Sequence, residues 1–392
     1  MFVRSSRTTL PIIGECSTVV VGGSMAGVAA AVALAGSGQR VVLVEPRTYL
    51  GREISATQRP WLARSQVGHA SPSVIAECIA QEGVVLRQDE YALHLDALKT
   101  CLENLVLEAG IDLLYSSYPV GIVRADGSLR GIAIANKSGR QAIGCQAVLD
   151  ATETALVARL AGSEFVSDGQ PAVYRRTIEF DRVGDFPGDT LPVPADLGLA
   201  QDSVAVHRGC LSTGHVYVDY GVRLPSRVSS LSARRALDAL IQRKGLQLTQ
   251  HLRDRVAEFS RYTQLGASSY EPWGPMTDQL SGPSPEWARE HEGAAVPVVI
   301  GDRTVGEVEL SSFAAPQPGL WCLSEAARID PAMAGVWADV VAASRLGDAL
   351  GALLSRLPRT RHRARTGSLA MSTTGDVLED LEIAEQEAPQ RG

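Results

Sequence analysis

The sequence predicts an α/β fold built on a parallel sheet, with a second, mixed β/α domain inserted into it. Three observations predict the first domain: an apolar, β-branched run at residues 19–21 enters a glycine-rich turn, an alanine-rich stretch follows, and a second apolar run ends at Glu45. Strand, turn, helix and strand in this order make the Rossmann-like unit that binds a dinucleotide. We therefore expect a dinucleotide-binding domain near the amino terminus.

The turn itself indicates how the nucleotide is held. Gly22 allows a tight turn, Gly27 lets the helix lie close to the sheet, and a pyrophosphate accepts the free N–H groups at the helix start. Glu45 is placed to accept hydrogen bonds from a ribose diol. The G-x-G-x-x-G pattern is incomplete, because Ser24 stands where its second glycine belongs, and the serine hydroxyl can itself donate to a phosphate. The residues assigned to this part of the site are Gly22, Gly23, Ser24, Met25, Ala26, Gly27, Glu45, Pro46 and Arg47.

Composition narrows the class of protein. A chain of 392 residues that is 45% hydrophobic can bury one large core or two domains, and a net charge of −7 does not favour a nucleic-acid partner. The six cysteines are scattered singly, without metal-ligand spacing, so we expect reduced thiols, no metal site and a cytoplasmic location. No run approaches the ~20 apolar residues of a membrane helix, so we expect a soluble protein.

Further elements follow in order along the chain. Apolar residues at helical spacing between 93 and 110 predict a helix ending at Gly110, and 111–115 reads as the next strand. Three short strands at 120–124, 129–135 and 140–143, joined by Asp-Gly and Ser-Gly turns, predict a β meander. Residues 145–151 then return the chain to the main sheet.

The domain limits follow from these elements. Residues 1–16 form a leader, 17–168 the first part of the nucleotide-binding domain, and 169–300 an inserted substrate or cap domain with strands at 176–180 and 215–220 and a helix at 230–259. Residues 301–357 form the second part, with a strand at 319–324 and a helix at 335–354. The arginine-rich and then acid-rich segment 358–392 is expected to be disordered.

Together these pieces resemble the FAD-dependent oxidoreductases of the glutathione-reductase/fumarate-reductase-like superfamily, over about 17–165 and 305–357. Residues 49–54 resemble the family's loop that passes along the pyrophosphate and flavin. Residues 148–155 resemble its Asp-Ala-Thr-Gly segment, with Glu153 in place of the glycine. Residues 319–336 resemble its C-terminal flavin segment, in which a strand and loop lead to a helix whose N-terminus faces the flavin ring.

The resemblance implies FAD bound non-covalently, with Arg52 neutralising phosphate charge. It adds these cofactor residues: Arg52, Glu53, Ile54, Val120, Ala151, Thr152, Glu153, Asp330, Gly335 and Val336. Ser24 and Glu153 depart from the family pattern, which leaves open a non-catalytic, flavoprotein-like partner subunit.

The inserted region offers few candidates for catalysis. His215, Tyr217 and Asp219 share one face of a predicted strand, which either lines a pocket over the flavin or meets water, and Tyr220 takes the other face. Arg328, in the C-terminal flavin segment, is either an active-site group or part of a structural ion pair. The catalytic candidates are therefore His215, Tyr217 and Arg328.

The expected function is oxidation of a small organic substrate by hydride transfer to FAD. Residues 170–300 contain no second glycine-rich strand–turn–helix unit, so any NAD(P)H would bind transiently, or a partner reductase would supply electrons. The alternative is a flavin-dependent monooxygenase that hydroxylates an electron-rich, aromatic substrate with O₂ and an external reductant. A homo-oligomer is compatible with the sequence, which does not name the substrate.

Overall fold

The fold is described by a computed structural model. The described residues are 10–67, 74, 78, 85–87, 90–125, 128–166, 171–186, 188–225, 231–269, 271–273, 279–330, 333–357 and 370–372.

The predicted parallel sheet is present and confirms the fold class. Its strand order is β22-β11-β2-β3-β7, and every neighbouring pair is parallel. Four buried, β-branched residues form β2, which is typical of a central strand covered on both faces. The strands are β2 (Thr18–Val21), β3 (Val41–Val44), β7 (Asp112–Leu114), β11 (Ala147–Asp150) and β22 (Leu320–Cys322).

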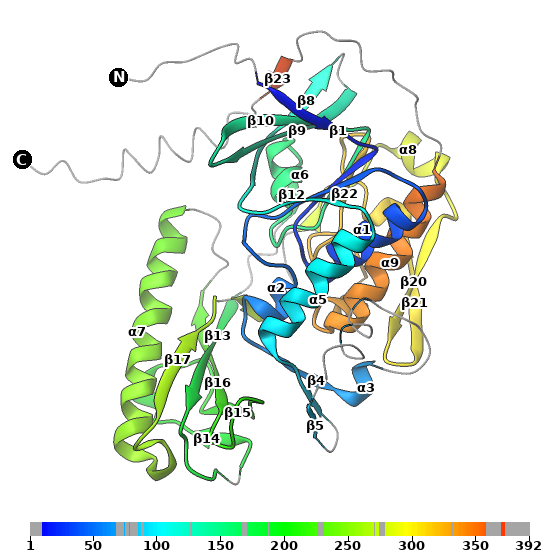
Figure 1. The fold of residues 1–392 in the computed structure, drawn as a ribbon. Coiled ribbons are helices and arrows are strands. Elements are labelled where there is room, and N and C mark those ends of the chain that lie inside the picture. The colour runs from blue at the N-terminus through cyan, green and yellow to red at the C-terminus, as the bar shows by residue number, and fades with distance from the viewer. Residues whose placement is uncertain are drawn as a thin grey trace, which may run out of the picture.

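Two helices far apart in the sequence pack tightly together on this sheet (Figure 1). Helix α1 (Met25–Gly36) follows the glycine turn, and α9 (Val340–Arg356) is the last helix among the described residues. Two glycines of α9 allow the contact: a Cβ on Gly347 would collide with the backbone oxygen of Ala26, and one on Gly351 would lie 2.7 Å from the backbone oxygen of Ala30. The C-terminal helix therefore packs in the same core as the helix that follows the glycine turn.

The meander forms a second sheet, at the end of the molecule away from α7 (Leu231–Arg255) (Figure 1). Its order is β1-β10-β9-β8-β23, so it recruits one strand from the expected leader and one from the expected disordered segment. Residues 1–9, 358–369 and 373–392 lie outside the described residues. The strands are β1 (Ile12–Glu15), β8 (Tyr118–Ala125), β9 (Ser128–Asn136), β10 (Gly139–Gly144) and β23 (Ala370–Ser372).

Cysteine pairing differs from the prediction. The expectation of six reduced thiols is wrong, because Cys78 and Cys101 form a disulfide in the core behind α1. Cys101 lies on α5 (Leu95–Glu108), the predicted helix, and no motif spacing links it to a partner 23 residues away. The cysteines consequently no longer argue for a reducing compartment.

Short elements connect α1 to α5. They are two short helices and a three-stranded sheet whose order is β4-β6-β5, and α5 follows them along the chain. These elements are α2 (Arg52–Ser55), β4 (Trp61–Ala63), α3 (Arg64–Val67), β5 (Val85–Arg87) and β6 (Glu90–Ala92).

The inserted domain is an antiparallel sheet covered on one face by α7 (Figure 1). Its order is β14-β15-β16-β13-β17, with β18 also paired to β13. Phe180, Val218 and Tyr220 face α7, and the Tyr220 hydroxyl donates to the backbone oxygen of Ile241 at 2.8 Å. The strands are β13 (Ala172–Asp181), β14 (Thr190–Pro192), β15 (Ser203–Arg208), β16 (Val216–Leu224), β17 (Thr263–Ala267) and β18 (Glu271–Trp273).

The two segments that connect the domains lie side by side, because β12, before the inserted sheet, pairs with β19, after it. The hairpin β20–β21 follows, and its Val296 and Val298 pack in the same core as α1 and α9. Strand β20 therefore belongs with the nucleotide-binding core, whereas the sequence-based boundary at 300 assigns it to the insert. The remaining elements are α6 (Leu156–Leu160), β12 (Phe165–Val166), β19 (Gln279–Leu280), α8 (Pro285–Glu290), β20 (Ala295–Ile300), β21 (Arg303–Glu309) and 3₁₀ turns at Ala195–Leu197, Ala257–Phe259, Leu310–Ser312 and Ala334–Trp337.

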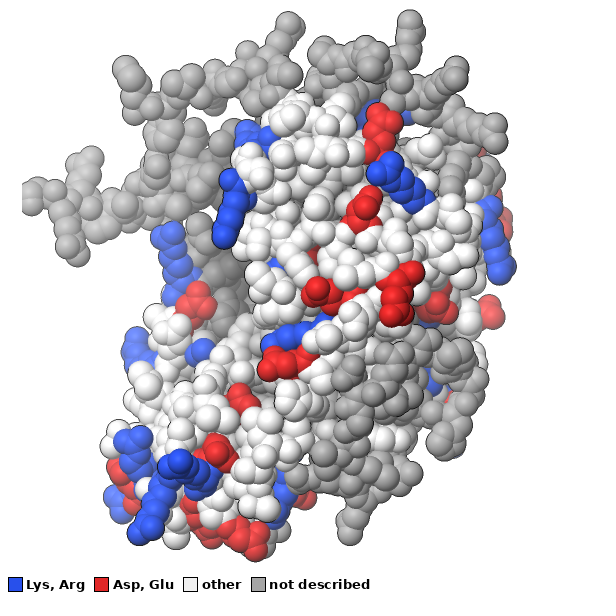
Figure 2. All heavy atoms as spheres, in the orientation of Figure 1, with Lys and Arg blue, Asp and Glu red and all other residues white. Residues whose placement is uncertain are grey.

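The surface shows mixed charge. On the face in Figure 2, acidic and basic side chains are interspersed rather than gathered by sign. Among the described residues, no helix is both long enough and apolar enough to cross a membrane.

Candidate functional site

The glycine turn lies directly against the end of β11. Gly22 has a φ of +101°, and a Cβ there would lie 2.6 Å from the backbone oxygen of Ala151. A Cβ on Gly27 would collide with the backbone oxygen of Gly22 and lie 2.9 Å from the Ala151 side chain. The two segments that the resemblance assigns to the cofactor, 22–27 and 151–153, are therefore adjacent, and only glycine permits this approach.

The start of helix α1 carries donors suited to an anion, and carboxylates of the chain accept from some of them. The Ser24 hydroxyl oxygen caps the helix by accepting from the Gly27 N–H at 2.9 Å, so its own proton remains available to a phosphate. The Glu45 carboxylate is buried and accepts from the Gly23 N–H at 2.5 Å, and Glu53 accepts from the Met25 N–H at 3.0 Å. Carboxylates of the chain itself thus accept hydrogen bonds from backbone N–H groups of the turn and the first turn of α1.

Two arginines converge on Glu153 beside this turn. One Glu153 oxygen lies 2.7 Å from Arg47 Nη2 and 3.4 Å from Arg52 Nη1. Arg52 Nη1 is buried and has no hydrogen-bond acceptor. Two guanidinium groups, one with an unused donor, beside the positive end of α1 fit the pyrophosphate of a dinucleotide.

Asp150 fixes the loop that carries Glu153. Its buried carboxylate accepts from the Thr152 N–H and hydroxyl at 3.1 and 2.6 Å, and from the Ala158 N–H at 2.9 Å. Burial raises the pKa of Asp150, whereas these hydrogen bonds lower it. Asp150 therefore ties β11 to α6 and holds Thr152 and Glu153 next to the turn.

The other expected cofactor residues occupy several places. Ala26 and Ile54 are buried beside the turn, Pro46 is half-buried after β3, and Val120 lies in β8 of the meander. Near the C-terminal segment, Val336 is buried, whereas Gly335 and Asp330 are exposed. The helix expected from 335 begins at Val340, where Asp339 caps it, and residues 334–337 form a 3₁₀ turn instead.

Arg328 is held by local packing contacts. Its guanidinium donates to the backbone oxygen of Ser311 at 2.6 Å and lies where a Cβ on Gly282 would stand. Burial lowers its pKa. None of these contacts involves His215 or Tyr217.

A half-buried carboxylate, Glu179 of β13, joins the other two catalytic candidates. His215 Nε2 lies 2.8 Å from Glu179 Oε1, and the Tyr217 hydroxyl donates to the same oxygen at 3.2 Å. The Leu211 N–H donates to His215 Nδ1 at 3.1 Å, so Nε2 carries the proton of a neutral ring and donates it to Glu179. Two side chains that the sequence singles out, His215 and Tyr217, therefore meet at one oxygen of Glu179.

Neighbouring residues make room for the side chains that contact Glu179. Gln58 has a φ of +51°, which is costly for a residue with a side chain, and its Nε2 lies 3.4 Å from Glu179 Oε2. Gly266 of β17 leaves room for this amide, because a Cβ there would lie 3.0 Å from it. Gly209 likewise leaves room for the His215 ring, with which any Cβ would collide. The side chain of Glu179 is only 13% exposed.

Residues from the first domain cover this face of the sheet, so the expectation that it meets water is wrong. Trp61 stacks on His207 with ring centroids 3.7 Å apart, and Arg59 forms an ion pair with Asp219 at 3.4 Å. Burial lowers the pKa of His207 to about 4 and raises the pKa of Asp219 to about 6. Burial, followed by the charge of Glu179, also raises the pKa of Tyr217, which keeps its hydroxyl protonated.

The raised pKa of Asp219 predicts how the free energy of unfolding changes with pH. Its pKa is higher in the folded chain than the ordinary value, so the folded state binds the proton more tightly and loses stability as the pH rises toward the folded pKa. Relative to Asp219→Asn, the wild type should lose about 1 to 1.5 kcal/mol of unfolding free energy between pH 5 and pH 7.5. Urea denaturation of both proteins at these two pH values measures it; a difference that does not change with pH contradicts it.

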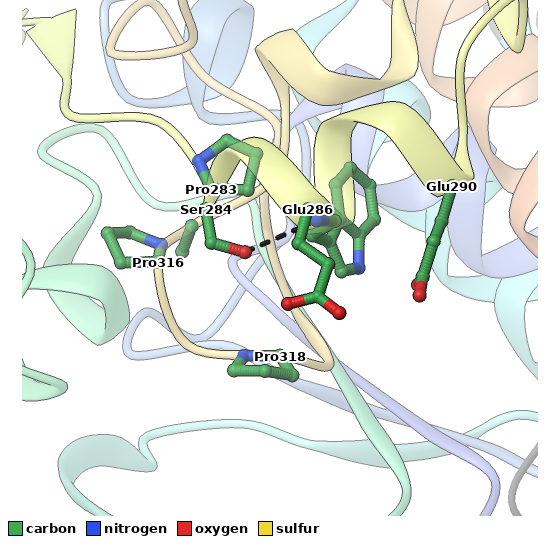
Figure 3. A pocket seen from close by; sticks show the side chains of 8 residues that line it. Pro283, Ser284, Glu286, Glu290, Pro316 and Pro318 are labelled. Carbon is green, nitrogen blue, oxygen red and sulfur yellow. Dashed lines mark hydrogen bonds between the residues drawn. The ribbon is translucent and has the colours of Figure 1, made fainter.

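A separate pocket of about 180 Å³ lies between the start of α8 and the loop at 315–318 (Figure 3). Prolines and Trp287 form its walls, Glu286 and Glu290 stand at its edge, and the Ser284 hydroxyl caps α8 by accepting from the Trp287 N–H at 3.2 Å. It shares no residue with the glycine turn or the Glu179 cluster.

Solved structures share this fold. A geranylgeranyl bacteriochlorophyll reductase-like protein from Thermoplasma acidophilum is 16% identical with a TM-score of 0.52, covering 86% of this chain and 76% of its own. An anhydrotetracycline hydroxylase from Streptomyces rimosus is 11% identical with a TM-score of 0.51, covering 87% and 62%. A flavin-dependent brominase is 9% identical with a TM-score of 0.51, covering 88% and 80%. Among curated protein sequences, none matches the chain significantly.

The family assignment comes from the sequence itself. The profile of the family described as FAD dependent oxidoreductase matches residues 18–261, more than half of the chain, from the first strand of the parallel sheet to the inserted domain. The matched segment contains the glycine turn, the converging arginines and the Glu179 cluster. The chain belongs to the FAD dependent oxidoreductase family, and its cofactor is FAD.

Proposed function

We propose that this enzyme oxidises a small organic substrate by transferring a hydride to FAD, with Glu179 accepting the accompanying proton. The observation that supports the proposal most directly is the half-buried Glu179 carboxylate, which three donors from His215, Tyr217 and Gln58 hold in place. When bound, the flavin supplies the acceptor for the hydride. In a substrate with a C–H beside an O–H or N–H, the C–H hydrogen would thus pass to the flavin as hydride, and the O–H or N–H proton would pass to Glu179.

The chain path supports placing this carboxylate near the flavin. The family resemblance puts residues 49–54 along the pyrophosphate and flavin, and Gln58 follows only four residues later. Ala56 accepts hydrogen bonds at 2.9 Å from both the Ser269 N–H and its hydroxyl, which attaches this stretch to the inserted sheet. The segment from Arg52 to Trp61 therefore runs from the pyrophosphate side to the Glu179 face.

The second candidate is a monooxygenase that hydroxylates an electron-rich substrate with O₂ and an external reductant. The inserted domain is compatible with both reactions: its described residues form an antiparallel sheet and one long helix. The fold likeness to an anhydrotetracycline hydroxylase is compatible with this candidate. In both reactions a residue that accepts a proton beside the flavin is required.

The first test is the absorbance spectrum of the purified protein between about 300 and 600 nm. We expect the two bands of oxidised flavin, and we expect heating to release the chromophore into solution, because no covalent link is proposed. A protein that stays colourless with excess FAD would favour the non-catalytic partner subunit.

The two reactions are then separated by anaerobic screening. Substrates that bleach the flavin without NAD(P)H and without O₂ support hydride transfer from the substrate. Consumption of NAD(P)H and O₂ together, only when substrate is present, supports the monooxygenase.

A further inference from the structure

Three carboxylates of the chain occupy donors beside the expected pyrophosphate position. Glu45 accepts from the Gly23 N–H, Glu53 from the Met25 N–H, and Glu153 bridges Arg47 and Arg52. Three carboxylates and two guanidinium groups leave this cluster with one excess negative charge. Glu153 also stands where the family pattern has a glycine, which carries neither charge nor side chain.

Glu53 and Glu153 contact donors expected to bind the phosphates, whereas Glu45 lies where the ribose is expected. Glu45 is 1% exposed and follows β3, where the ribose is expected, so it serves a hydroxyl partner. Glu53 instead accepts from an N–H in the first turn of α1, the position at which a helix attracts a phosphate. Glu153 accepts a hydrogen bond from Arg47 and forms an ion pair with Arg52, the two guanidinium groups that would neutralise the same phosphate.

We propose that Glu53 and Glu153 are internal anions that hold the pyrophosphate donors of the turn, and that FAD binds by displacing them. An entering diphosphate must take its N–H and guanidinium donors from these carboxylates and approach like charges. Arg52 Nη1 is buried and makes no hydrogen bond within the chain, only a 3.4 Å ion pair with Glu153, so it is the donor most easily transferred to the diphosphate. The two carboxylates therefore weaken FAD binding and make the flavin exchangeable.

The inference rests on FAD as the cofactor and not on the reaction proposed above, so the two can fail separately. Binding is measured directly on protein stripped of flavin, by quenching of FAD fluorescence. Reduction of the flavin by substrate does not enter this measurement.

Glutamine variants provide the test because they keep the accepting oxygen and remove the charge. Glu53→Gln and Glu153→Gln should each lower the Kd for FAD by between about threefold and tenfold, and the double variant by roughly the product. Glu108→Gln, an exposed charge on α5, is the matched control and should leave the Kd unchanged. Thermal melts of the flavin-free proteins verify that each variant is folded.

Two simpler ligands show which part of FAD the two carboxylates affect. The affinity for ADP, which carries the diphosphate without the flavin, should rise by a similar factor, whereas the affinity for adenosine should not. An unchanged Kd for FAD in both single variants would overturn the inference. Weaker binding by Glu153→Gln would also overturn it, because Glu153 would then orient the arginines for FAD instead of competing with it.

Discussion

Glutamine in place of Glu179 should slow the reduction of the flavin by substrate by about 10² to 10⁴-fold, the range typical of a lost proton acceptor. The amide cannot take up a proton at pH 7, although it keeps nearly the same shape. The Glu179 oxygens receive hydrogen bonds from His215, Tyr217 and Gln58, so the variant should remain folded and should retain FAD. Stopped-flow absorbance under anaerobic conditions measures the rate.

The matched control is Asp181→Asn, which changes a carboxylate at the end of the same strand. Ser212 donates to Asp181, and this hydrogen bond lowers the pKa of Asp181, but no contact joins Asp181 to Glu179. Asp181→Asn should therefore reduce the flavin at the wild-type rate. If Glu179→Gln does the same with its flavin content intact, Glu179 is not the proton acceptor.

Gly27→Ala should weaken FAD binding by on the order of a hundredfold, equivalent to about 2.7 kcal/mol. The added methyl would collide with the backbone oxygen of Gly22 and press on the Ala151 side chain, so the turn and the end of β11 must separate. Overpacking of this kind also costs about 1 to 3 kcal/mol of stability. FAD titration and urea denaturation measure the two effects.

Gly36→Ala is the control in the same helix. Its Cβ would meet no atom within 4 Å, so the change should leave FAD binding intact and be neutral or slightly stabilising. Equal effects of the two alanines would mean that the close approach at Gly27 does not position the cofactor.

The sequence predicted the parts of the site that depend on local pattern. The apolar run of β2, the glycines at 22 and 27 and the acid after β3 lie within one short stretch, where spacing alone defines the geometry. The face shared by His215 and Tyr217 followed from strand alternation, which the structure reproduces.

Residues whose roles depend on long-range contacts were not predictable in this way. Glu179 was missed because its partners come from β16 and from Gln58, which is 121 residues away along the chain. The only local signal was an acid between two apolar residues, Ile178 and Phe180, near the end of β13. The hydrogen bonding of His215 was also not predictable, since the Leu211 N–H that occupies Nδ1 comes from a loop without a recognisable pattern.

The contact between α1 and α9 has a consequence for the synthesis of this protein. Helix α1 emerges from the ribosome near the start of translation, but the surface that Gly347 and Gly351 present to it is made more than three hundred residues later. Until then the apolar side of α1 lacks its cover, while the inserted sheet and α7 are already complete. The inserted domain is thus able to fold first. A nascent chain interrupted before α9 would expose the apolar side of α1, which chaperones or proteases could recognise.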